Sequence, residues 1–157
     1  MNAPHIRKAF FSDAQIIAAF NAAMALESEG RRLEPGILLP GVTAVIENEK
    51  NGFYLLAELE GEVVGQLLIT YEWSDWRNGM FWWIQSVYVK PEERGRGVFG
   101  RLYRHAEKEA QKSGACGLRL YVEKDNAGAQ KIYSNLGMSE TAYRLYEVEF
   151  KSRNADD

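Results

Sequence analysis

The stretch RGRGVFG, residues 94–100, places three glycines and two arginines at the start of an amphipathic segment. Glycine destabilises a helix relative to alanine, so its repeated use here needs a chemical reason. The first turn of a helix presents unpaired N–H groups and a partial positive charge, and it therefore binds anions. Glycines let a phosphate approach those N–H groups, and Arg94 and Arg96 add positive charge. The stretch predicts a phosphate-binding loop; the alternative is an ordinary strand-to-helix turn with surface arginines.

Two common nucleotide-binding motifs do not fit this loop. A P-loop would need Gly-Lys-Ser or Gly-Lys-Thr after the glycines, and neither follows. The dinucleotide fingerprint requires a different glycine spacing, and the strand before this loop belongs to a series of hairpins.

A second candidate group lies in NAGAQKIY, where Asn126 follows an expected strand and Tyr133 comes seven residues later. That separation is about two turns of a helix. A phenol can act as a general acid, so Tyr133 is a candidate catalytic residue. Tyr133 also belongs to an apolar stripe with Ala129, Ile132 and Leu136, so a structural tyrosine in the core is the alternative.

All four tryptophans lie between residues 73 and 83. Successive residues of a strand face opposite sides, so Trp82 and Trp83 cannot enter the same layer. We expect one of them to pack under a helix and the other to line a groove.

The remaining two tryptophans, Trp73 and Trp76, lie in or near a turn, close to Glu72 and Asp75. Tryptophan faces attract cations, so this group predicts an aromatic, acidic pocket for an amine. The alternative is core packing together with a surface for a homodimer.

Size and composition limit the class of protein. The chain has 157 residues, enough for one domain with a core, and we expect that domain to span residues 1–150 with a polar tail at 151–157. The net charge of −3 makes a nucleic-acid partner a poor expectation. The single cysteine, Cys116, fits a reducing compartment, which indicates the cytoplasm. Two histidines without clustered cysteines argue against a metal site, and no run has membrane-spanning length.

The order of elements predicts a domain of the α/β (α+β) class, with a mixed, mainly antiparallel central sheet flanked by helices. We expect strands at residues 5–10, 52–59, 63–73, 80–89, 117–126 and 141–150, and helices at 13–30, 98–114 and 127–137. Residues 31–41 are expected to form a loop or a short helix, and 42–49 a further helical stretch. The helical crossover between the strands at 80–89 and 117–126 makes that pair parallel.

Two segments, VYVKPEERGRGVFGRLY and VEKDNAGAQKIYSNLGM, resemble the GCN5-related N-acetyltransferase (GNAT) superfamily, and the resemblance covers most of the chain. The cofactor motif of that family, Arg/Gln-x-x-Gly-x-Gly/Ala, is matched by Arg94 and Gly97. Phe99 departs from the motif, and Gly100 follows one residue later.

The resemblance implies an N-acetyltransferase that uses acetyl-CoA. It implies cofactor contacts from Val87, Tyr88, Val89, Arg94, Gly95, Arg96, Gly97, Val98, Phe99, Gly100, Asn126, Ala129 and Tyr133. Tyr133 would protonate the departing thiolate. The strand before the loop carries no acid, so Glu72 is the first candidate for the general base and Glu123 a weaker one. The acceptor side would be lined by Trp73, Trp76, Trp83 and Gln85.

The predicted function is acetyl transfer to a primary amine of a small molecule or a peptide. One alternative is a non-catalytic acyl-CoA-binding module, suggested by Phe99 and the missing strand acid. Another is a protein acetyltransferase acting on lysine or an N-terminus. Neither a membrane nor a nucleic acid is expected as a partner.

Overall fold

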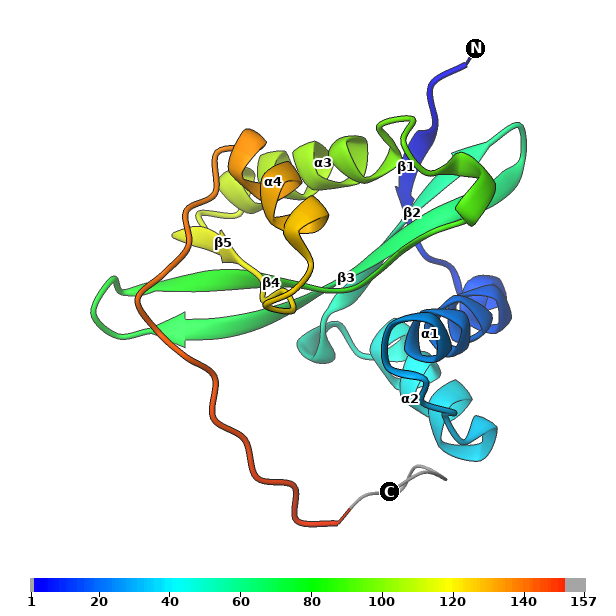
Figure 1. Ribbon diagram of the computed structural model, residues 1–157, viewed down its shortest axis with the longest axis horizontal. Helices are drawn as coiled ribbons and strands as arrows, with labels where there is room; N and C mark the ends of the chain where they lie inside the picture. Colours follow the sequence, from blue (N-terminus) through cyan, green and yellow to red (C-terminus); the bar gives the residue numbers. More distant parts are fainter. Residues whose placement is uncertain (1, 152–157) are drawn as a thin grey trace.

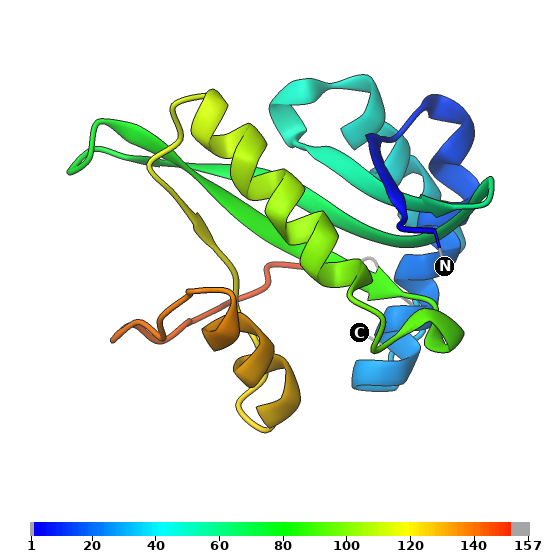
Figure 2. The same ribbon diagram turned by 90° about the horizontal axis from the view of Figure 1, so that it is seen from above.

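The computed structural model describes residues 2–151, which form a five-stranded sheet with helices on both faces (Figures 1 and 2). The strands are β1 (His5–Lys8), β2 (Phe53–Leu59), β3 (Glu62–Ser74), β4 (Gly79–Val89) and β5 (Gly117–Arg119). The helices are α1 (Ala14–Glu29), α2 (Pro35–Glu47), α3 (Val98–Lys112) and α4 (Ala127–Asn135). Neighbouring strands are consecutive in the chain, and only β4 and β5 run parallel. The predicted fold class and the parallel pair are confirmed.

Local turn chemistry explains the long antiparallel ribbon of β2, β3 and β4. Glu60 and Gly61 join β2 to β3 with positive φ values of 51° and 80°, as a tight hairpin turn of the primed type requires. Asn78 at the end of the β3–β4 turn has a φ of 49°. Both turns lie in the gaps between the strands expected at 52–59, 63–73 and 80–89.

Alternation along β2 divides the core into two layers. Leu55 is fully buried against the α3 side, where Leu67 and Leu102 also lie. Leu56, the next residue, is fully buried on the opposite face together with Ile17 of α1. Successive strand residues face opposite sides, so one apolar run supplies both layers.

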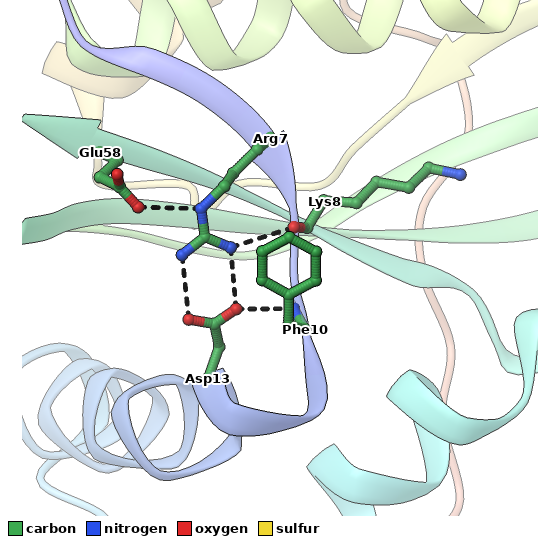
Figure 3. A network of polar contacts seen from close by, with 5 residues as sticks. All are labelled: Arg7, Lys8, Phe10, Asp13 and Glu58. Atoms are coloured by element: carbon green, nitrogen blue, oxygen red, sulfur yellow. Dashed lines mark hydrogen bonds and ion pairs between the residues drawn. The ribbon is translucent and has the colours of Figure 1, made fainter. Parts of the chain in front are cut away.

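An ion-pair network fixes the first strand to the first helix and to the sheet (Figure 3). Arg7 Nη1 and Nη2 donate to the two carboxylate oxygens of Asp13 at 2.9 and 3.1 Å, and Arg7 Nε donates to Glu58 at 2.9 Å. The carboxylate of Asp13 also accepts from the backbone N–H of Phe10 at 2.6 Å. The Arg7 guanidinium holds the pKa of the Asp13 carboxyl below its usual value. The network therefore ties β1, α1 and β2 together.

Three expected elements differ from the structure. Residues 35–47 form one continuous helix, α2, where a break was expected near residue 41. The strand expected at 117–126 is paired over Gly117–Arg119 alone. The strand expected at 141–150 does not form; after α4 this segment continues as an irregular coil outside the sheet (Figures 1 and 2). Backbone groups of 120–126 and 141–150 pair with no strand of the described chain, so neither segment forms a strand there.

The polar tail expected at 151–157 lies, apart from Lys151, outside the described residues. Of the helices in residues 2–151, none combines the length and apolar character needed to cross a lipid bilayer.

Candidate functional site

The sheet opens between β4 and β5. These strands pair over three residues, Phe81↔Gly117, Trp82↔Leu118 and Trp83↔Arg119. From Ile84 onward, β4 remains paired with β3 but has no partner strand on its other side among residues 2–151. The backbone at 87–89, for which the family resemblance implies cofactor contacts, lies on this open edge.

A bulge distorts β4 at the opening. Gln66 lies opposite Tyr88 and Leu68 opposite Gln85, so β3 advances two residues (66 to 68) while β4 advances three (85 to 88). Ser86 takes a positive φ of 50°, which non-glycine residues rarely adopt. The bulge turns the backbone of β4 away from a regular ladder where the open edge begins.

The bulge is tied to α1 through Gln66, a residue that the sequence analysis did not single out. Its fully buried side chain donates from Nε2 to the carbonyl oxygen of Ser86 at 3.0 Å and to Asn21 Oδ1 at 2.8 Å. The signal in the sequence was a single polar residue inside the apolar run VVGQLLIT.

Replacing Gln66 by leucine should leave Asn21 and the Ser86 carbonyl without their buried donor. We expect the free energy of unfolding to fall by about 1–3 kcal/mol in urea denaturation. The same change at Gln15, an exposed glutamine on α1, should alter it by less than about 0.5 kcal/mol. Equal stability of the Gln66→Leu protein and the wild type would contradict this account of the bulge.

The loop at residues 94–100 offers backbone donors toward an anion. Gly95 and Gly97 have φ values of 77° and 80°, in the left-handed region that favours glycine. The first helical hydrogen bond of α3 runs from Arg101 N to Gly97 O at 3.1 Å. Five preceding N–H groups donate to no backbone carbonyl within residues 2–151: those of Gly95, Gly97, Val98, Phe99 and Gly100. Successive N–H groups of this kind at a helix start are donors that can bind an anion.

The side chains of the two loop arginines take part in local contacts. Arg94 Nε donates to the Val89 carbonyl at 2.8 Å, and Nη2 pairs with Glu27 of α1 at 2.9 Å. Arg96 Nη1 pairs with Glu93 at 3.3 Å. The Arg94 contacts link the loop to the end of β4 and to α1. Because the arginine side chains already have these partners, the backbone N–H groups are the main candidates for binding an anion.

Aromatic packing brings α3 and α4 together beside this loop. The rings of Phe99 and Tyr133 meet edge to face, with centroids 5.8 Å apart, and Phe99 also lies 6.2 Å from Tyr103. The Phe99 side chain is thus directed toward α4, while its N–H donates to no backbone carbonyl among residues 2–151. Burial raises the pKa of the Tyr133 hydroxyl above its ordinary value.

The side chain of Asn126 caps α4. Its Oδ1 accepts from the backbone N–H of Ala129 at 3.1 Å. This bond explains why asparagine suits the position that begins the helix. The Asn126 amide nitrogen has two further donors, which the cap does not use.

A second polar group lies on β3, β4 and β5. Glu72 Oε1 accepts from Arg119 Nη1 at 2.7 Å and from Trp83 Nε1 at 3.1 Å. The Arg119 guanidinium, and then the Trp83 indole, hold the pKa of the Glu72 carboxyl below its usual value. The Trp83 ring lies 5.7 Å from that of Tyr121. We call Glu72, Trp83, Arg119 and Tyr121 the β4–β5 cluster. Sequence reasoning missed Arg119, because nothing local indicated that residue 119 would meet residue 72.

The other three tryptophans, Trp73, Trp76 and Trp82, lie in different environments. Trp82 is buried on the α3 side, with edge-to-face contacts to Phe53 and Tyr71 at 5.3 and 5.8 Å. The expectation that Trp82 and Trp83 serve different layers is therefore confirmed. Trp73 and Trp76 lie by the β3–β4 hairpin with exposed fractions of 58% and 85%, and neither joins the contacts of the β4–β5 cluster in the described chain.

Gln85 also lies near the opening of the sheet. Its Nε2 donates to Thr70 Oγ1 at 2.6 Å. A separate surface pocket of about 490 Å³ lies between the end of α3, the start of β5 and residues 137–139. None of the predicted site residues lines it.

The sequence and the fold both have relatives among known proteins. Residues 21–138 match the acetyltransferase (GNAT) family. The chain belongs to this family. It is 35% identical to a thialysine N-epsilon-acetyltransferase of Bos taurus over 75 residues, which are 48% of this chain and 44% of the bovine protein. The chain spans less than half the length of the curated relatives that it matches.

Solved structures show the same GNAT fold. A possible acetyltransferase from Clostridium difficile 630 superposes with a TM-score of 0.87 and 42% identity, covering 96% of this chain and all of that one. A predicted acetyltransferase from Clostridium acetobutylicum, whose structure was determined with acetyl-CoA, superposes at 0.73 with 20% identity over 92% of this chain and 96% of that one. The second likeness shows the fold alone.

Proposed function

We propose that the protein transfers the acetyl group of acetyl-CoA to a primary amine. The observation that supports this most strongly is the loop at 94–100, where five N–H groups lacking a described backbone acceptor precede α3 directly after the open edge of β4. A pyrophosphate needs such a row of donors. The open edge offers the backbone of Val87 and Val89 to the amides of a pantetheine arm, as an added strand would use it.

Asn126 and Tyr133 would meet the part of acetyl-CoA nearest to its sulfur. The Oδ1 atom of Asn126 accepts the hydrogen bond that caps α4. Its amide nitrogen would donate to a carbonyl of the pantetheine arm. Acetyl-CoA supplies an acetyl group bound to sulfur as a thioester. The amine nitrogen forms the new bond to the carbonyl carbon, the carbon–sulfur bond breaks, and the sulfur takes a proton from the Tyr133 hydroxyl.

The raised pKa of Tyr133 suits an acid. A hydroxyl with a pKa above its ordinary value stays protonated throughout the neutral range, so the proton is present when the thiolate leaves. The ring contact with Phe99 holds the phenol in place between α3 and α4. This contact gives the departure from the family motif at residue 99 a structural role.

The attacking amine must also lose a proton, and Glu72 is our candidate acceptor. Its lowered pKa means that it is ionised throughout the neutral range and able to accept, although it is a weak base. Arg119 partly balances its charge. We therefore propose that Glu72 orients the amine and passes the proton on to water.

The Glu72→Gln variant should show this in its pH dependence. Because the pKa of Glu72 is lowered, this carboxyl becomes protonated only below the neutral range. The fall of kcat/KM on the acid side of neutral pH therefore reflects protonation of the amine substrate. We expect the variant to lower kcat/KM for the amine about tenfold, less than a full general base contributes, without moving that limb. A limb that shifts or disappears in Glu72→Gln would show that Glu72 itself titrates there.

An amine panel with acetyl-CoA tests the proposed function. Release of free thiol, followed together with the mass of the acetylated product, should depend on the amine. Hits among small amines or among peptide lysines and N-termini would define the acceptor. Acetyl-CoA binding without turnover on any amine would favour the non-catalytic acyl-CoA-binding module.

A further inference from the structure

Two guanidinium groups lie against a single phenyl ring, on the face of the sheet that carries the β4–β5 cluster. The Cζ atom of Arg119 lies 3.7 Å from the centre of the Phe81 ring. The Cζ atom of Arg77, in the turn between β3 and β4, lies 4.9 Å from the same centre. Phe81 is buried, so its ring is a fixed support for both cations. Two like charges held close together repel each other, and a bound anion would relieve that repulsion.

Gly117 makes room for this arrangement. It lies opposite Phe81 in the parallel pairing of β4 and β5, and a Cβ atom at this position would lie 2.7 Å from the Phe81 ring. The ring therefore lies against the backbone of β5. Arg119 is two residues further along the strand and points to the same side. Glycine at 117 and arginine at 119 thus allow the guanidinium to stack on the ring.

The charges around this ring do not cancel. Glu72 Oε1 accepts from Arg119 Nη1 at 2.7 Å. Arg77 Nη1 donates to a hydroxyl instead, Ser74 Oγ at 3.3 Å, and Arg77 forms no ion pair within residues 2–151. Arg119, and more weakly Arg77, hold the pKa of the Glu72 carboxyl below its usual value, so both cations act on the same carboxylate. Two positive charges and one negative charge leave an excess of one positive charge.

The ion pair of Glu72 and Arg119 can be reached from solvent. The Arg119 side chain is 27% exposed and the Glu72 side chain is 46% exposed. Within residues 2–151, the guanidinium of Arg119 donates one hydrogen bond, from Nη1, so most of its five N–H donors are left for a ligand. The planar fork of a guanidinium matches the two oxygens of a carboxylate. Any group bound to Arg119 would also lie next to Glu72.

We propose that the acceptor is an amine that also carries a carboxylate, with the carboxylate bound by Arg119 and Arg77 and the ammonium group by Glu72. The inference rests on the proposed acetyl transfer, in which Glu72 orients the amine. Opposite charges of the acceptor then meet opposite charges of the site, and its amine and carboxylate need be only a few bonds apart. A purely cationic amine would leave the two guanidiniums without an anion.

The excess of one positive charge also favours a carboxylate over a phosphate. A phosphate monoester carries about 1.5 to 2 negative charges at pH 7, more than the site balances, whereas a carboxylate carries one. The amine of a lysine side chain or a protein N-terminus has no carboxylate within a few bonds. The proposal therefore favours a small amino acid over a protein as the acceptor.

Matched pairs of acceptors test the proposal. Glycine, β-alanine and γ-aminobutyrate, each compared with its carboxamide, place the carboxylate at three distances from the amine. In the best pair we expect kcat/KM for the acid to exceed that for the amide by about tenfold or more. Most of the difference should lie in KM, because the carboxylate is bound equally before and during the reaction. The amide has the less basic amine and hence more free amine, so chemistry alone would favour the amide.

The same panel distinguishes a failure of this inference from a failure of the proposed function. Equal efficiency with acids and amides would overturn the inference and leave acetyl transfer intact. No release of thiol from acetyl-CoA with any amine would overturn both. A preference for an aminoalkylphosphonate over the carboxylate of the same length would also overturn the inference, because the site would then select the larger negative charge.

The Arg119→Gln variant assigns the preference to this site. Its readout is the ratio of kcat/KM for the acid to kcat/KM for the amide, which a general loss of activity does not change. We expect the ratio to fall to near one in Arg119→Gln and to fall in part in Arg77→Gln. A ratio that survives Arg119→Gln would overturn the assignment; if that variant does not fold, Arg77→Gln and the wild-type ratio decide.

Arg104→Gln is the matched control. Arg104 also stacks on an aromatic ring, that of Tyr103 at 5.6 Å, and pairs with a carboxylate, that of Glu107 at 2.9 Å. It lies on α3, however, away from the β4–β5 cluster. The variant removes the same charge from the protein, and we expect the acid-to-amide ratio to stay at the wild-type value. An equal fall of the ratio in Arg104→Gln and Arg119→Gln would overturn the proposal, because the preference would then follow the net charge of the protein.

Discussion

The Tyr133→Phe variant should lose turnover and keep its affinity for acetyl-CoA. Phenylalanine retains the ring that meets Phe99 at 5.8 Å and removes only the hydroxyl. General acid catalysis contributes about 10²–10⁴ in rate, so we expect kcat to fall by a factor in that range. Steady-state kinetics gives kcat, and calorimetry with acetyl-CoA gives the affinity.

Tyr103→Phe is the matched control. Tyr103 also packs against Phe99, at 6.2 Å, and is buried, so this variant removes a hydroxyl from the same aromatic group. We expect it to retain nearly full kcat. An equal loss in both variants would assign the effect to packing, and full turnover of Tyr133→Phe under conditions where chemistry limits the rate would make Tyr133 a core residue. An acetyl thioester whose thiol is more acidic than that of CoA depends less on a general acid. With such a thioester, the difference in kcat between Tyr133→Phe and the wild type should be smaller.

The Gly100→Glu variant should lose acetyl-CoA binding while the protein itself becomes no less stable. A Cβ at Gly100 meets no heavy atom within 4 Å, and its φ is not positive, unlike that of Gly97. Glutamate in the first turn of α3 interacts favourably with the helix dipole, by about 0.3–1 kcal/mol. Where a pyrophosphate must lie, however, the carboxylate adds bulk and repulsion. We expect the affinity to fall at least about a hundredfold, which corresponds to about 2.8 kcal/mol.

Gly100→Gln separates charge from size, because glutamine has nearly the same shape as glutamate. Its loss of affinity in calorimetry should be smaller, and the thermal midpoints of both variants should equal or exceed that of the wild type. Unchanged affinity in a folded Gly100→Glu protein would place the pyrophosphate elsewhere.

Features with a local cause could be predicted from the sequence. Gly95 and Gly97 have positive φ and the following residues begin a helix, so the shape of this loop could be predicted without knowledge of distant residues. The tight turn at Glu60–Gly61 has a local cause in the same sense. The cap at Asn126 is also local, but the sequence analysis assigned this residue to the cofactor and predicted no cap. The alternation of side chains along β4 also predicted correctly that Trp82 and Trp83 lie on opposite faces of the sheet.

Features that depend on distant residues were missed. Gln66 meets Asn21 across 45 positions, and Glu72 meets Arg119 across 47, so neither contact has a signal in its own segment. The expected strand at 141–150 failed for a related reason. Its residues favour a strand, but strand formation depends on an edge, and the sequence does not say which molecule supplies that edge.

Amide hydrogen exchange with and without acetyl-CoA tests the central claim most directly. Acetyl-CoA should slow exchange at the N–H groups of residues 95–100 and at the open edge of β4 around Val87–Val89, because a bound pyrophosphate and pantetheine arm would occupy those donors. The pocket between α3 and β5 should be unaffected. Protection confined to that pocket, at Ala115–Leu118 and Gly137–Ser139, with none at 95–100, would contradict the account.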